Sequence, residues 1–82
     1  MMQAINYQVE SWQRRDWRKA TRRYSCELRQ NLFGDWVVLR RWGRVNAAKG
    51  QSIEHPCESF DQGLEILSAI EKRRLQRGYT HP

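Results

Sequence analysis

The stretch from Trp36 to Val45, WVVLRRWGRV, is the best guide to the fold of this chain. Its first four residues are apolar on both faces of a strand, which favours a central strand over an edge strand. Because side chains alternate along a strand, Arg40, Trp42 and Arg44 share one face, with a guanidinium about 6.5 Å to either side of the indole. Such a surface suits stacking on a sugar or base with phosphate contacts. A core tryptophan with an arginine stacked on its ring has the same spacing.

Alternation of apolar and polar residues predicts three further strands around this central one. Residues 5–10 and residues 24–29 both show the period of two that is typical of a half-buried strand. The turn signal of residues 31–34 separates the second of these from the central strand. Residues 51–57 form a short strand, which Pro56 restricts to an edge of the sheet or to its last position.

From Ser59 onward the apolar period changes to that of a helix. Ser59 and Gln62 fit a capping box, and Gly78 is a plausible stop after the last turn. Six residues form one broad stripe: Phe60, Gly63, Leu64, Ile66, Leu67 and Ile70. The pattern predicts an α+β fold, in which an antiparallel sheet of about four strands is covered on one face by this C-terminal helix. Its other face stays open.

Length and charge indicate a single basic domain over residues 1–82. The 82 residues can build one core, and their formal net charge of +6 favours a polyanionic partner. Residues 1–49 hold eleven basic and four acidic side chains, whereas residues 50–71 hold five acidic and no basic ones. The cluster within residues 72–77 fits dipole compensation at the end of the helix better than ligand contact.

The segment 12–23 is charged and without period, and we expect a basic loop there. Together with Trp12 and Trp17 it is either a phosphate-tracking loop with stacking groups or a solvated loop whose tryptophans pack on the sheet. Its candidate contact residues are Arg14, Arg15, Arg18, Lys19 and Arg22.

Other classes of function find no support in the sequence. No signal peptide or membrane span is expected, and two cysteines without a secretory signal predict reduced thiols in the cytoplasm. The soft metal ligands lack the spacing of a zinc site, so no metal or other cofactor is expected. No catalytic motif is present, and we expect a protein that is not an enzyme.

The motif Trp42-Gly43-Arg44-Val45 resembles that of the WGR domain, in its small stand-alone bacterial form. The strand before it, Gly50-Gln51 after it and the final Arg77-Gly78-Tyr79 extend the resemblance over about residues 24–79. It implies an antiparallel sheet with one helix and a role in nucleic-acid binding. One departure is Asn46, where the family usually has glycine.

The same domain occurs in DNA-dependent poly(ADP-ribose) polymerases, where it contacts a DNA end. There the motif tryptophan lies against the terminal sugar, and the motif arginine contacts DNA and neighbouring domains. The resemblance carries these roles to Trp42 and Arg44. We therefore expect nucleic acid, DNA above all, as the partner. The alternative is a module that docks a partner protein through the same surface, since Trp and Arg are also enriched at protein interfaces.

Overall fold

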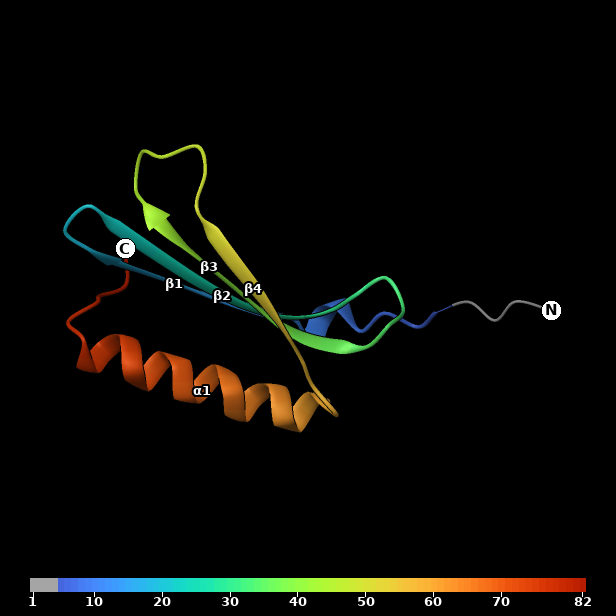
Figure 1. The fold of residues 1–82 in the computed structure, drawn as a ribbon. Coiled ribbons are helices and arrows are strands. Elements are labelled where there is room, and N and C mark those ends of the chain that lie inside the picture. Colours follow the sequence, from blue (N-terminus) through green and yellow to red (C-terminus); the bar gives the residue numbers. More distant parts are fainter. Residues whose placement is uncertain (1–4) are drawn as a thin grey trace.

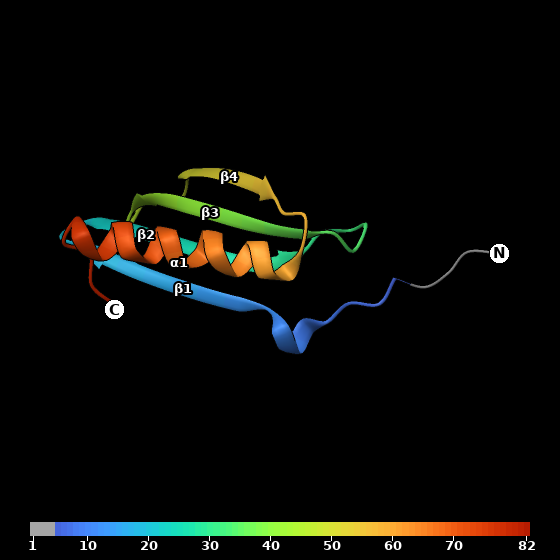
Figure 2. The ribbon, with the colours of Figure 1, turned by 90° about the horizontal axis from the view of Figure 1, so that it is seen from below.

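Four strands and one long helix make up the fold in the computed structural model, which describes residues 5–82 (Figure 1). The strands are β1 (Gln13–Lys19), β2 (Arg22–Gln30), β3 (Trp36–Arg44) and β4 (Gln51–Pro56), followed by α1 (Phe60–Gln76). They form one antiparallel sheet in the order β1-β2-β3-β4, and α1 lies across one face of it (Figure 2). This confirms the expected α+β class and the central position of β3.

The segment expected to be a basic loop is instead the strand β1 and the tight turn after it. Lys19 pairs with Arg22, so Ala20 and Thr21 alone connect β1 to β2, and Ala20 takes a positive φ of 52°. Trp17 is the one fully buried side chain of β1. Polar side chains fill nearly all other positions of this edge strand, so no apolar alternation marks it in the sequence.

Residues 5–10 are wrongly predicted as a strand. Residues 5–8 have no regular structure, and a 3-10 helix, η1 (Val9–Ser11), follows them. Side chains hold the segment in place, because Tyr7 Oη donates to the carbonyl oxygen of Leu32 and Gln8 N donates to Gln30 Oε1. Its apolar residues therefore pack over the β2–β3 turn and pair with no strand.

The covered face of the sheet carries the core. Opposite residues of an antiparallel pair share a face, and the register places Leu28 opposite Val38. The buried cluster has seven members: Trp17, Tyr24, Cys26, Leu28, Val38, Leu67 and Tyr79. All five of its strand members point toward α1, so the opposite face of the sheet is left open, as expected.

The helix begins and ends where the sequence indicates. Ser59 caps it by accepting a hydrogen bond from Gln62 N at 3.1 Å, and Gln62 Oε1 in return accepts from Glu58 N. Gly78 takes the left-handed conformation after the last turn, with a φ of 85°. Among the described residues no helix is long and apolar enough to cross a membrane.

The C-terminal tail returns to the sheet along the outer edge of β1. Thr80 and Arg18 exchange two backbone hydrogen bonds, of 2.9 and 2.7 Å. His81 lies beside the buried Trp17 with 6.0 Å between the ring centroids, and its Nδ1 is 3.2 Å from the carbonyl oxygen of Asp16. The tail thus covers the edge of the sheet and the largest core side chain together.

Candidate nucleic-acid interface

Trp42 lies on the covered face of the sheet, near the end of β3. The register sets it opposite Tyr24, and the two rings stack with 5.9 Å between centroids and 15° between planes. Its side chain is half-buried. Trp42 therefore packs against the core, as expected of a core tryptophan with an arginine stacked on its ring. Part of its side chain is still exposed.

The glycine of the motif allows a close approach of two backbones beside Trp42. A Cβ atom on Gly43 would lie 3.2 Å from the Cα of Gly50, and one on Gly50 would lie 2.5 Å from the carbonyl oxygen of Trp42. Glycine at both positions therefore lets the chain entering β4 pass against the end of β3. This contact fixes the backbone from which Trp42 projects.

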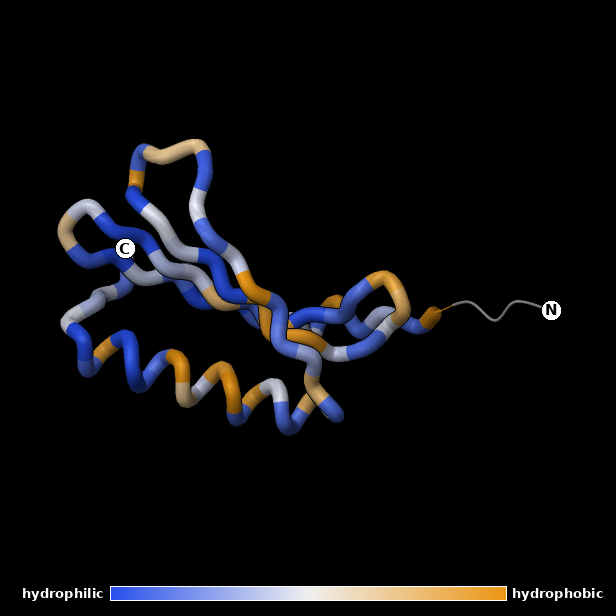
Figure 3. The backbone as a smooth tube through the Cα atoms, viewed as in Figure 1, coloured by the Kyte–Doolittle hydropathy of each residue, from blue (hydrophilic) through white to orange (hydrophobic). Residues whose placement is uncertain are grey.

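A cleft opens around Trp42 between the end of the sheet and the end of α1. Its volume is about 430 Å³. Three aromatic and five basic side chains line it: Tyr24, Trp42, Tyr79, Lys19, Arg22, Arg40, Arg74 and Arg77. We call this the Trp42 cleft. The last part of α1 and the neighbouring strand ends are predominantly hydrophilic in Figure 3.

None of the five cations in the Trp42 cleft pairs with a carboxylate within residues 5–82. Lys19 Nζ instead donates to the carbonyl oxygen of Arg77 at 2.7 Å, and Arg40 Nε donates to Tyr24 Oη. Arg74 lies over the ring of Tyr24, with its guanidinium carbon 4.3 Å from the centroid. Rings and uncharged oxygens therefore contact three of the five cations, Lys19, Arg40 and Arg74, and the salt bridges of the described residues neutralise none of the five.

The carboxylates of the sheet are on the opposite face. There Arg14 pairs with Asp16 at 3.1 Å, and Arg29 pairs with Glu27 at 3.3 Å. The hydrogen bond to Asp16 raises the pKa of Arg14. The two faces thus differ in kind, since the open face has mixed charges and the Trp42 cleft has cations alone.

The structure brings together four of the eight residues predicted to bind. Lys19, Arg22, Arg40 and Trp42 line the cleft. Arg44 is exposed at the end of β3 and lines a smaller hollow of about 220 Å³ that also contains Trp42 and Arg22.

The other three predicted residues lie away from the cleft on β1. Arg14 and Arg18 are exposed on the open face, across the sheet from the cleft. Arg15 is on the covered face, where its guanidinium donates to Gln13 Oε1 at 3.0 Å. Of the candidate residues within 12–23, only Lys19 and Arg22, beside the turn between β1 and β2, line the Trp42 cleft.

Four residues of the cleft were not among the predicted contact residues: Tyr24, Arg74, Arg77 and Tyr79. Arg74 and Arg77 belong to the basic cluster that the sequence analysis assigned to dipole compensation. A signal for Arg74 was present, because it continues the stripe at seven residues after Leu67. An arginine at a core-facing position is 9% exposed here and lies between the rings of Tyr24 and Tyr79. The charged residue on the apolar stripe of α1 was therefore a sequence signal for this position in the lining of the Trp42 cleft.

The cysteines and histidines were considered as metal ligands in the sequence. No group of three or more His, Cys, Asp or Glu residues that could hold a metal ion occurs in the described part of the chain. Both cysteines are free, and burial raises the pKa of the Cys26 thiol to about 12. Burial also raises the pKa of Cys57. Neither thiol is activated as a nucleophile.

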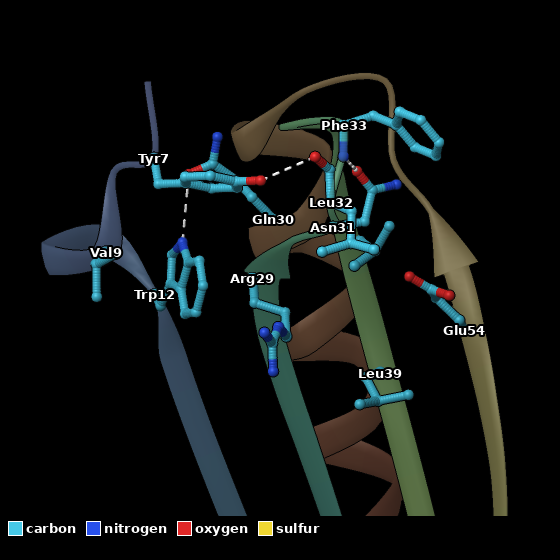
Figure 4. A pocket seen from close by; sticks show the side chains of 11 residues that line it. Tyr7, Val9, Trp12, Arg29, Gln30, Asn31, Leu32, Phe33, Leu39 and Glu54 are labelled. Atoms are coloured by element: carbon cyan, nitrogen blue, oxygen red, sulfur yellow. Dashed lines mark hydrogen bonds between the residues drawn. The ribbon is translucent and has the colours of Figure 1, made fainter. Parts of the chain in front are cut away.

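A second hollow lies on the open face, at the β2–β3 turn (Figure 4). This open-face groove has a volume of about 700 Å³, with Tyr7, Trp12 and Leu39 among its lining residues. Leu32 and Phe33 stand at its rim and are 84% and 80% exposed. The exposed apolar surface is thus concentrated at the end of the sheet opposite the basic cleft.

The fold is that of a small basic α+β domain with a cation-lined cleft at one end of its sheet. The chain belongs to the WGR domain family, whose model matches residues 7–82. This is a non-catalytic domain family associated with nucleic-acid binding.

One curated relative is similar in sequence. It is the uncharacterized protein y4dW of Sinorhizobium fredii (strain NBRC 101917 / NGR234), which is 32% identical over 62 residues. The match covers 76% of this chain and 30% of the relative, so the chain corresponds to less than a third of that protein. No solved structure matches the chain.

Proposed function

We propose that this chain is a non-catalytic module that binds nucleic acid, DNA in particular, through the Trp42 cleft. The observation that supports this most is a half-buried tryptophan surrounded by five cations that no carboxylate neutralises within the described residues. Family membership supports the same class of ligand. The two free cysteines agree with a reducing compartment, and we propose the cytoplasm as the location.

In this proposal the cations bind the phosphate backbone, and the aromatic residues restrict the orientation of the bound nucleic-acid strand. Lys19, Arg22 and Arg77 are exposed at the mouth of the cleft and can meet successive phosphates. Trp42 presents its exposed part to a sugar or base, while Tyr24 supports the other side of the indole by stacking. Sequence-independent binding with a strong dependence on salt follows from this arrangement.

Titration of fluorescently labelled nucleic acid at several salt concentrations tests the proposal. Blunt duplex DNA, single-stranded DNA and RNA of one length are compared, with binding followed by anisotropy. If about four phosphates are neutralised, log K for duplex falls with log[salt] at a slope of about -3.6. No binding at low salt, or a slope near zero, contradicts the proposal.

Matched variants assign the binding to the cleft. Arg22→Met and Arg77→Met each remove one cation at the mouth, whereas Arg41→Met removes an exposed cation from the open face of β3. All three lower the net charge equally. The cleft variants should each reduce the magnitude of the salt slope by about 1, and Arg41→Met should leave it almost unchanged. Equal effects from all three would place the contact elsewhere.

Docking of a partner protein is a second candidate function, and the structure offers a different surface for it. The open-face groove and the exposed Leu32 and Phe33 form an apolar patch of the kind that marks interaction sites. Phe33→Ser would remove part of this patch. In the same titration it should leave nucleic-acid affinity unchanged, and a loss of affinity would mean that the two surfaces are not independent.

A further inference from the structure

Arg74 is a buried cation without an acid. Its side chain lies between two aromatic rings, with the guanidinium carbon 4.3 Å from the centroid of Tyr24 and 5.1 Å from that of Tyr79. It is 9% exposed, and its Nε has no hydrogen-bond acceptor among the described residues. Ring faces compensate a cation only in part, and a buried charge without a partner is unfavourable. The position therefore favours an anion.

A second guanidinium approaches the same tyrosine. The guanidinium carbon of Arg40 is 5.6 Å from the centroid of Tyr24, and its Nη1 is 3.3 Å from His55 Nε2. No carboxylate in residues 5–82 pairs with either arginine. Two cations thus lie around one ring, and every hydrogen-bond partner of Arg40 within that range is a neutral oxygen or a ring nitrogen.

A separate groove reaches these two arginines from the β4 side of α1. Its volume is about 440 Å³, and Arg40, Arg74 and Tyr24 form the wall that it shares with the Trp42 cleft. Ile66, Ala69 and Ile70 of α1 supply its apolar lining, and His55 of β4 and the exposed Arg73 of α1 also line it. We call it the His55 groove. Its size is within the range of small-molecule sites, and it combines an apolar floor with cations at one end.

We propose that the His55 groove binds a small phosphate monoester with an apolar body. The phosphate lies against Arg40 and Arg74, and the body rests on Ile66 and Ile70. A monoester carries a charge of about -1.5 to -2 near neutral pH, which suits the two inner guanidiniums of Arg40 and Arg74 better than the single charge of a carboxylate does, and the exposed Arg73 adds a third cation to the groove. This site goes beyond the proposed function, because His55, Ile66 and Ile70 line the groove and none of them lines the Trp42 cleft.

Calorimetric titration at constant ionic strength and pH 7.5, without nucleic acid, tests the proposal. The probes are phenyl phosphate, inorganic phosphate, benzoate and phenol. Phenyl phosphate should bind most tightly, because it alone has both the dianion and the apolar body. Phenyl phosphate that fails to bind, or binds no tighter than inorganic phosphate or benzoate, would overturn the proposal. Because Arg40 and Arg74 also line the Trp42 cleft, a substitution at Ala69, which lines the groove alone, separates binding in the groove from binding in the cleft.

Two pairs of variants locate the binding. Arg74→Met should weaken phenyl phosphate about tenfold or more, the effect of losing a charge-assisted hydrogen bond, and Arg41→Met should not. Because Arg74 is also a packing residue, a second pair leaves it in place. Ala69→Phe fills the groove from an exposed helix position, and Ser68→Phe adds the same ring at the adjacent exposed position outside the groove. Loss of binding in Ala69→Phe alone supports the site, and equal binding by both variants refutes it.

Discussion

Gly63 is the point of closest approach between α1 and the sheet, and replacing it by alanine should destabilise the protein. In an open helix this change would stabilise by about 1 kcal/mol, through helix propensity. Here the added Cβ would lie 2.3 Å from Leu28 Cδ1, whereas carbon atoms in contact are normally about 3.5–4.0 Å apart. Leu28 is fully buried, so its side chain cannot relieve the contact by turning toward solvent. Overpacking of this kind costs about 1–3 kcal/mol, and the upper part of that range applies.

The net expectation for Gly63→Ala is a loss of about 1–2 kcal/mol, or roughly 5–10 °C in Tm. Urea denaturation followed by circular dichroism measures the loss. Ser68→Ala, at an exposed position of the same helix, serves as the control and should be neutral or slightly stabilising. In the Leu28→Ala background the penalty of Gly63→Ala should shrink by at least about 1 kcal/mol. A Gly63→Ala protein as stable as the wild type would refute the reasoning.

Four further predictions separate core, contact surface and thiol chemistry. Leu67→Ala should cost about 2–5 kcal/mol of unfolding free energy, measured by urea denaturation, because Leu67 is 3% exposed in the core. Arg44→Ala should weaken duplex binding in an anisotropy titration by about 1.5–3 kcal/mol with an unchanged Tm, whereas Trp42→Ala should also lower Tm because its ring stacks on Tyr24. The pKa of Cys26 is about 12 in the folded state, above the ordinary 9.0, so the unfolded state releases this proton at lower pH. The free energy of unfolding should therefore fall as the pH rises from 9 to 12. Denaturation curves of Cys26→Ala should show a smaller fall over that range. Elemental analysis should find no stoichiometric zinc, and a zinc-loaded protein whose Tm drops with a chelator would contradict this.

The strands that alternate strongly were predictable, and the strand that does not alternate was not. β2 buries every second residue, so period two is visible in residues 24–29, whereas β3 buries the adjacent Val37 and Val38 and was recognisable as a central strand because its first residues are apolar on both faces. β1 has one buried anchor, Trp17, and otherwise polar side chains, and its strand state is set by pairing with β2. Residues 5–10 alternate in sequence but do not form a strand, because no strand lies beside them to pair with.

Four of the eight residues that line the Trp42 cleft were predicted from the sequence, and the other four could be recognised only from the face of the sheet that α1 covers. Period two correctly placed Arg40 and Trp42 on one face, but nothing local indicates that this face lies under the helix. Arg74 and Tyr79 reach Trp42 only because the chain folds back after β4. Contacts between residues so far apart in sequence follow from tertiary packing. The one sequence feature that indicates them is the apolar stripe of α1, which ends in Arg74.

The pairing of Thr80 with Arg18 has a consequence for the order in which the molecule assembles. The two residues are 62 positions apart in a chain of 82 residues, so their contact closes a long loop. Such closure carries a large entropy loss and becomes favourable only after the sheet and α1 are in place. The amide protons of Arg18 and Thr80 should therefore exchange with solvent whenever the tail opens, ahead of the protons within β2 and β3. Each opening also frees the outer backbone groups of Arg18, so the tail blocks one position at which the edge strand β1 could pair with another molecule.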